Sequence, residues 1–217
     1  MVIKAQKYNT MDSGIQIMEK PDWVSWETIH DVLWEAHAEN RKNGVFMRYP
    51  SLSGEEIKRR IDDNGKMFVA IEDGKVIGSA ALVYKTKTLW CGKGIYGYCC
   101  FASVLPSYQG RGVYKELCIQ REQEARDNGI MKLIMDTNEN NKKELSIIYQ
   151  AGYKKVNYVF WKDHFNVVCV KWLDGCPFSQ FRCWFEFHKQ RCLVKMKHIL
   201  KSFIKKRNEP QSRHHRA

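Results

Sequence analysis

The spacing of apolar positions in the first part of the chain predicts one strand followed by two helices. Apolar residues alternate over 14–19, as in a strand. They then recur every three or four positions over 22–43, as on one face of a helix that ends at Gly44. A second helix is expected to begin at Ser53, because a serine followed three residues later by Glu56 forms a capping box.

The centre of the chain predicts three neighbouring strands. Two apolar runs, 67–71 and 76–84, are separated by Asp73-Gly74, a pair that favours the backbone of a tight hairpin turn. A third apolar run extends from Ile95 to Val104. We therefore expect a hairpin and one further strand in the same sheet.

The remaining pattern alternates between helix and strand. Helices are predicted over 113–128 and 141–151, and strands over 131–135, 154–161 and 166–173. The resulting order is β-α-α-β-β-β-α-β-α-β-β. It indicates an α/β domain with a single mixed, mostly antiparallel sheet that is flanked by helices.

Charge and composition divide the chain into three parts. We predict an N-terminal segment over 1–14, a domain over 15–174 and a tail over 175–217. Of the net charge of +12, the tail carries +9, because 11 basic and 2 acidic residues follow Gly175. Its apolar residues recur at helical spacing, so we expect a basic amphipathic helix with a disordered end. Such a helix either docks on the domain or binds an anionic membrane surface or RNA.

The composition favours a folded cytoplasmic protein, peripheral to a membrane if its tail binds lipid. Hydrophobic residues make up 44% of the chain, no apolar run is long enough to span a bilayer, and the N-terminus lacks the apolar stretch of a signal peptide. The eight cysteines include no C-x-x-C pair, which favours buried thiols in a reducing compartment and no metal. The alternative, a zinc site at Cys183, His188 and Cys192, has no recognised ligand spacing.

The most informative segment is the turn Gln109-Gly110-Arg111-Gly112, which lies between a predicted strand and a predicted helix. Glycines let backbone N–H groups approach a ligand closely, and a helix N-terminus carries partial positive charge, so the turn suits a diphosphate. It lacks the Gly-Lys-Ser/Thr ending of a Walker loop. It also lacks the third glycine and the downstream acid of a dinucleotide-binding fingerprint.

This segment resembles motif A of the GNAT superfamily of N-acetyltransferases, Gln/Arg-x-x-Gly-x-Gly/Ala. Gln109 and Gly112 match the first two fixed positions, and the third falls on Tyr114. The preceding Val104-Leu105-Pro106 matches the strand end that the family has there. A second family motif, Asn-x-x-Ala-x-x-Leu-Tyr-x-x-x-Gly-Phe, is similar to the segment with Asn141, Glu144, Ile147, Ile148, Gly152 and Tyr153 at its fixed positions.

The resemblance covers about residues 15–174 and implies transfer of an acetyl group from acetyl-CoA to a primary amine. The acceptor stays open between a small molecule, an amino sugar, a peptide N-terminus and a lysine. The matched positions imply a set of residues that bind the cofactor: Val104, Gln109, Gly110, Arg111, Gly112, Val113, Tyr114 and Asn141.

The resemblance defines catalysis less well. The family's fourth helix often carries a tyrosine that protonates the leaving thiolate. That position is Ile148 here, so the neighbouring Tyr149 is the candidate, although one step along a helix turns a side chain by about 100°. The strand over 95–104 contains no acid, which excludes a carboxylate base on it. Tyr96 and Tyr98 either line the acceptor site or fill the core, and deprotonation through water would require only positioning.

Two other functions remain open. The missing tyrosine and the acid-free strand favour a non-catalytic acyl-CoA-binding module, and the tail favours a protein that associates with a membrane or RNA. A covalent acetyl carrier at Cys99 or Cys100 is disfavoured, because apolar surroundings raise the pKa of a thiol.

Overall fold

The computed structural model describes residues 9–10, 14–45, 51–61, 64–86, 95–161 and 164–175, and the single positions 181, 185, 192 and 196. The strands are β1 (Asn9–Thr10), β2 (Gln16–Glu19), β3 (Gly65–Glu72), β4 (Lys75–Lys85), β5 (Tyr96–Val104), β6 (Lys132–Asn138), β7 (Lys154–Trp161) and β8 (His164–Trp172). The helices are α1 (Trp26–Ala36), α2 (Ala38–Lys42), α3 (Gly54–Ile61), the 3₁₀ turn η3 (Pro106–Tyr108), α4 (Val113–Asp127) and α5 (Lys142–Gln150).

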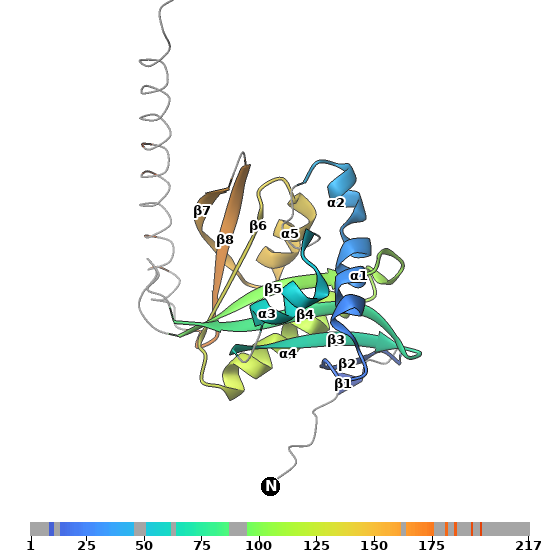
Figure 1. Ribbon diagram of the computed structural model, residues 1–217. Coiled ribbons are helices and arrows are strands. Elements are labelled where there is room, and N and C mark those ends of the chain that lie inside the picture. The colour runs from blue at the N-terminus through green and yellow to red at the C-terminus, as the bar shows by residue number, and fades with distance from the viewer. Residues whose placement is uncertain are drawn as a thin grey trace, which may run out of the picture.

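The strands form one mixed, mostly antiparallel sheet in the order β1-β2-β3-β4-β5-β6-β8-β7, which confirms the predicted fold class (Figure 1). Among the described strands, only β5 and β6 are parallel, and their pairing is limited to Gly97–Leu133 and Tyr98–Ile134. Beyond Tyr98 the two strands diverge, and β6, β7 and β8 turn away from β5. We refer to β5 from Cys99 to Val104 as the open edge of β5.

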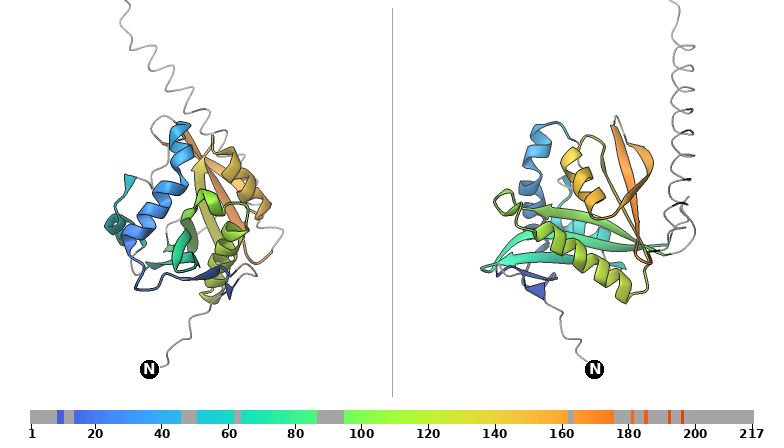
Figure 2. Two further views of the ribbon diagram at one scale, coloured as in Figure 1. Left: turned by 90° about the vertical axis from the view of Figure 1, so that its right-hand side faces the viewer. Right: turned by 180° about the vertical axis from the view of Figure 1, so that it is seen from behind.

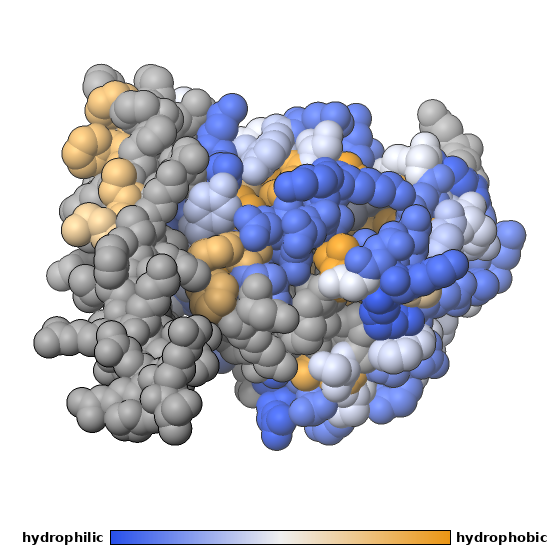
Figure 3. All heavy atoms as spheres, turned by 90° about the horizontal axis from the view of Figure 1, so that it is seen from above, coloured by the Kyte–Doolittle hydropathy of each residue, from blue (hydrophilic) through white to orange (hydrophobic). Residues whose placement is uncertain are grey.

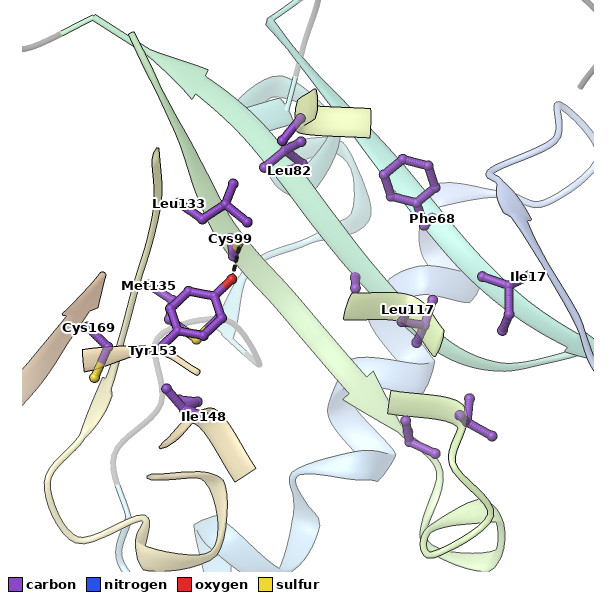
Figure 4. Close-up of a cluster of buried hydrophobic side chains, with 14 of the residues drawn as sticks. Ile17, Phe68, Leu82, Cys99, Leu117, Leu133, Met135, Ile148, Tyr153 and Cys169 are labelled. Carbon is purple, nitrogen blue, oxygen red and sulfur yellow. Dashed lines mark hydrogen bonds between the residues drawn. The ribbon is translucent and has the colours of Figure 1, made fainter. Parts of the chain in front are cut away.

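Helices cover both faces of the sheet (Figure 2). A first core lies beneath α4 and α5 and is drawn in Figure 4. A second core packs α1 and α3 against the opposite face, and a third, smaller one lies between β5, β6, β7 and β8. The open edge of β5 therefore has the layer of α1 on one side and the layer of α4 and α5 on the other.

The hairpin between β3 and β4 is as predicted. Its two turn residues, Asp73 and Gly74, both have a left-handed backbone, with φ of 49° and 75°. A two-residue turn of this kind matches the right-handed twist of the strands that it joins. The sequence therefore determines this pairing locally.

The capping box at α3 is also confirmed. The backbone N–H of Glu56 donates to Ser53 Oγ at 3.2 Å, and the N–H of Ser53 donates to Glu56 Oε2 at 2.9 Å. We expect Ser53→Ala to lower the free energy of unfolding by about 1 kcal/mol, measured by urea denaturation. Ser146→Ala is the control, because Ser146 is exposed within α5. An equal loss in both variants would contradict the capping role.

The prediction of one continuous helix over 22–43 is wrong, because the structure has two shorter helices there. Ser25 caps α1, accepting a hydrogen bond from the N–H of Thr28 at 3.0 Å, so the helix begins later than expected. It is interrupted at His37, whose φ of −102° and ψ of 13° separate α1 from α2. The imidazole of His37 contacts the sheet there, a tertiary interaction that helical spacing does not reveal.

β5 contains an irregularity that the sequence pattern does not predict. The register between β4 and β5 shifts after Ser79, and Phe101 has a left-handed backbone with φ of 51°. Both Cys100 and Phe101 consequently belong to the core on the α1 side. This bulge lies in the middle of the open edge of β5.

Beyond Gly175, the predicted amphipathic tail lies outside the described residues except at four positions. Phe181, Phe185, Cys192 and Met196 are helical and exposed. Docking of the tail and its partners therefore stay predictions, as do the limits of the N-terminal segment. Across the described part of the chain, no helix is both long and apolar enough to span a membrane.

Candidate functional site

The glycine-rich turn has the geometry of an anion-binding site. Gly110 and Gly112 have φ of 81° and 83°, and Gly112 is the N-cap of α4 with no side-chain hydrogen bond to the helix. A Cβ built on Gly110 would meet no atom within 4 Å. The first N–H groups of α4 have no partner within the helix and lie at the positive end of its dipole, and there is open space beside Gly110, an arrangement that fits a diphosphate.

Side chains hold this turn in place from two directions. Gln109 Nε2 donates to the carbonyl oxygen of Val104 at 3.1 Å, and Gln109 Oε1 accepts from Lys143 Nζ at 2.7 Å. The Arg111 guanidinium donates to Glu72 at 3.2 Å and lies 5.2 Å from the Tyr108 ring centroid. Arg111 thus orients the turn against β3 through its side chain. Lys143, on the first turn of α5, is a cation at the site that sequence reasoning missed.

The open edge of β5 presents backbone carbonyl groups that β6 does not pair. Two of them accept hydrogen bonds from side chains: Val104 from Gln109, and Ala102 from His37 Nε2 at 3.3 Å. A strand edge with such groups can form hydrogen bonds with an extended, amide-containing ligand. The edge begins beside the glycine-rich turn and leads to Tyr98, where β5 and β6 meet.

A carboxylate lies at the point where β5 and β6 separate. The hydroxyl of Tyr98, on β5, donates a short hydrogen bond to Asp136 Oδ1, and Asn166 Nδ2 of β8 donates to Asp136 Oδ2 at 2.8 Å. All three side chains are half-buried. β5 itself contains no acid, and the carboxylate at this place comes from Asp136 of β6. Sequence reasoning missed Asp136 because the predicted strand ended one residue before it.

The two tyrosines proposed from alternation have different environments. Tyr96 is buried in the core between β5 and β8. Tyr98 packs beside it and holds Asp136. The prediction that they share one face is correct, and the hydroxyl of Tyr98 bonds the Asp136 carboxylate.

Tyr149 lies elsewhere. Its side chain is 40% exposed, and partial burial, together with nearby Cys169 and Tyr158, raises its pKa to about 12. Those neighbours belong to β8 and β7, whereas Ile148 points into the first core (Figure 4). The structure does not bring Tyr149 to the open edge of β5, so its catalytic role stays a prediction without geometric support.

Three further residues of the predicted cofactor set, Tyr114, Asn141 and Val113, have structural contacts. The ring of Tyr114 packs against the first core, and burial raises its pKa, so it does not crowd the turn. Asn141 is the N-cap of α5: its Oδ1 accepts from the N–H of Glu144 at 3.3 Å, and its Nδ2 donates to the Glu144 carboxylate at 2.6 Å. Val113 is buried beneath the first turn of α4, so only its backbone faces the turn.

The thiols near the site are not poised to react. Cys99 and Cys100 are buried, and burial raises the pKa of both. Cys99 Sγ contacts the hydroxyl of Tyr153 at 3.6 Å inside the first core (Figure 4). No group of side chains within the described ranges could hold a metal ion, whereas Cys183 and His188 lie outside those ranges.

A separate pocket of about 510 Å³ lies between α1 and the turn of the β3–β4 hairpin. Its lining includes the carboxylates Asp31, Glu35 and Asp73 and reaches Leu105, directly after β5. It touches neither the glycine-rich turn nor Asp136, so it adjoins the site without containing its chemistry.

Comparisons with known proteins agree with this geometry. The model of the acetyltransferase (GNAT) family matches residues 26–153. A curated relative, the glucosamine 6-phosphate N-acetyltransferase of Trypanosoma brucei brucei, is 31% identical over 117 residues, which cover 51% of this chain and 77% of the relative.

Solved structures share the fold. An acetyltransferase from Streptococcus agalactiae superposes with a TM-score of 0.58 at 18% identity, covering 74% of this chain and 99% of that one. A GNAT family acetyltransferase from Elizabethkingia anophelis with acetyl-CoA bound gives 0.54 at 15% identity, covering 73% and 98%. Together with the family match, the open edge and the glycine-rich turn lead to one conclusion: the chain belongs to the acetyltransferase (GNAT) family and is an N-acetyltransferase that uses acetyl-CoA.

Proposed function

We propose that this enzyme acetylates a primary amine that binds where β5 and β6 separate. The observation that carries the proposal is the Asp136 carboxylate, which Tyr98 and Asn166 hold at the inner end of the open edge of β5. A half-buried carboxylate favours a cationic or hydrogen-bonding amine at that place. The acetyl donor, acetyl-CoA, supplies the activated thioester.

Each part of the site would make one contribution. The N-terminus of α4 and Lys143 would neutralise the diphosphate, and the carbonyl and N–H groups along the open edge of β5 would orient the pantetheine arm. Asp136 would accept hydrogen bonds from the acceptor amine and hold its nitrogen beside the thioester. Positioning of this kind supplies a large part of the rate enhancement in bimolecular transfers.

The curated relative suggests which acceptor to test first. That protein is named for acetylating glucosamine 6-phosphate, an amino sugar with one primary amine. The identity of 31% supports an amine acceptor and leaves the rest of the acceptor open. Acetyl-CoA turnover should therefore be measured by thiol release, with glucosamine 6-phosphate, polyamines and lysine peptides as acceptors. Tight acetyl-CoA binding without acetylation of any amine would favour the non-catalytic binding module instead.

Asp136→Asn tests the acceptor end of the site. We expect KM for the amine to rise about tenfold, because a hydrogen bond to a charged group contributes about 1.5–3 kcal/mol. The affinity for acetyl-CoA, measured by calorimetry, should stay unchanged. Asp127→Asn, at the exposed end of α4, is the matched control. Unchanged kinetics in Asp136→Asn would remove this carboxylate from the acceptor site.

We also propose that the enzyme works in the cytoplasm, as the sequence suggested. The free, buried thiols of Cys99, Cys100, Cys118 and Cys169 support a reducing compartment. Fractionation of cells that express a tagged full-length chain would test this location, and comparison with a chain ending at Gly175 would test the tail.

A further inference from the structure

The site contains a histidine that the proposed function has not used. His37 lies at the break between α1 and α2, with a backbone in the sparsely populated region between helix and strand. Its side chain is buried, and its Nε2 contacts the carbonyl oxygen of Ala102 at 3.3 Å. A titratable group is thus held against the open edge of β5, on the side of α1.

The contacts of the ring assign its tautomer. A carbonyl oxygen can only accept, so Nε2 carries the proton and donates it to Ala102. Nδ1 therefore holds the lone pair. Its neighbour is the Nδ2 of Asn40 at 3.4 Å, a distance at which the hydrogen bond is weak and can be exchanged for another donor.

The surroundings of the ring favour its neutral form. Burial lowers the pKa of His37, and the positive charge of Arg41 on α2 lowers it further, whereas the bond to the Ala102 carbonyl opposes both. The strand packed against the ring thus presents a backbone oxygen, and the nearby charge is the cation on α2. At neutral pH the imidazole is unprotonated and can accept a proton.

The place of Ala102 along β5 puts His37 on the path of the ligand. Ala102 lies between Val104, which Gln109 of the glycine-rich turn contacts, and Tyr98, which holds Asp136. A ligand arm that extends from the turn along this edge must pass His37 before it reaches the point where the strands meet. The imidazole consequently flanks the stretch in which a thioester and an amine would meet.

We propose that His37 is the catalytic base of the transfer, an inference that rests on the proposed function. The amine nitrogen forms a bond to the acetyl carbonyl carbon, and the carbon–sulfur bond breaks with its electron pair on sulfur. The proton lost by the amine goes to Nδ1 of His37, and the CoA thiolate takes a proton from solvent. Asp136 holds the amine, and His37 removes its proton.

The decisive variant is His37→Gln. Its side-chain amide can still donate to the Ala102 carbonyl, so it preserves the structural contact and removes the base. The acceptor probe is methoxyamine, whose nitrogen stays unprotonated in mildly acidic solution and which needs no shaped pocket. We expect kcat to fall about a hundredfold. Calorimetric affinity for acetyl-CoA and the urea midpoint should stay unchanged, and added imidazole should restore part of the rate.

The pH profile gives an independent measurement. For the wild-type chain, the acid decline of kcat should be centred below the ordinary histidine pKa of about 6.5, because burial lowers the pKa of His37 and the protonated ring cannot accept a proton. That decline should be absent in His37→Gln and present in the control His30→Gln, which removes a histidine of α1 that bonds Asp31 instead of the sheet.

The outcomes separate the two proposals. If the wild-type chain turns over methoxyamine and His37→Gln does so equally fast, or keeps the acid decline, His37 is not the base and the proposed function stands. If His37→Gln loses acetyl-CoA affinity, the residue positions the cofactor edge and the base assignment is wrong. If the wild-type chain binds acetyl-CoA and acetylates no amine, the proposed function fails first.

Discussion

Gly112→Asp should abolish acetyl-CoA binding. Gly112 is the N-cap of α4, and its backbone N–H belongs to the turn that fits a diphosphate. A carboxylate there would lie within about 4 Å of the phosphates, where like charges repel by about 4 kcal/mol near a protein surface. That repulsion corresponds to about a thousandfold loss of affinity, which calorimetry with CoA would detect as the absence of heat.

Gly112→Asn is the matched control for this substitution. Gly112 has φ of 83°, a conformation that Asn and Asp adopt more readily than other side chains, and both residues are good N-caps. The two variants therefore differ mainly in charge. A much smaller loss in Gly112→Asn would assign the effect to electrostatics, and equal losses would assign it to steric crowding. Unchanged affinity in Gly112→Asp would place the diphosphate elsewhere.

Tyr153→Ala should have the largest effect on stability. Its side chain is 1% exposed and lies in the first core among Cys99, Met135 and Ile148 (Figure 4). Removing a buried aromatic ring costs about 3–5 kcal/mol in lost burial and in the cavity that remains. For a domain stabilised by about 5–15 kcal/mol, the urea midpoint should drop sharply.

Two further variants test whether the loss of stability comes from the burial of the Tyr153 ring. Tyr153→Phe keeps the ring and loses only the contact of the hydroxyl with Cys99, so it should be nearly as stable as the wild-type chain. Tyr149→Ala removes a ring that is 40% exposed on α5, the helix that precedes Tyr153 in the chain, so its cost should be below about 1 kcal/mol. Comparable losses in Tyr149→Ala and Tyr153→Ala would contradict the assignment of Tyr153 to the core. A large drop of kcat in Tyr149→Ala at normal stability would instead support its catalytic role.

The face of the molecule that carries α2 and α5 is mostly polar. Seen from the side of α2 and α5, hydrophilic residues cover most of the described face, and apolar residues show between them (Figure 3). The acidic pocket between α1 and the hairpin adds negative charge near Leu105.

Several elements of this protein follow from short stretches of sequence. The hairpin turn at Asp73-Gly74 and the capping box at Ser53 are determined by the residues that form them, because their hydrogen bonds and backbone angles are local. The same is true of the turn from Gln109 to Gly112, whose glycines alone adopt the required conformations without strain. Local chemistry thus predicted these turns and caps, and the apolar pattern predicted most of the order of helices and strands along the chain.

The remainder of the site depends on contacts between residues that are distant in the chain. His37 interrupts a helix because its ring bonds Ala102, 65 positions away, and Asp136 reaches Tyr98 from another strand, 38 positions away. Helical or strand periodicity records which face of an element is apolar, and it carries no information on which elements become neighbours. Matching by position instead favoured Tyr149, which the packing of α5 turns toward β7 and β8. The glycine-rich turn could therefore be predicted from the chain itself, whereas the contacts of His37 and Asp136 with β5 depend on how distant elements pack in the folded sheet.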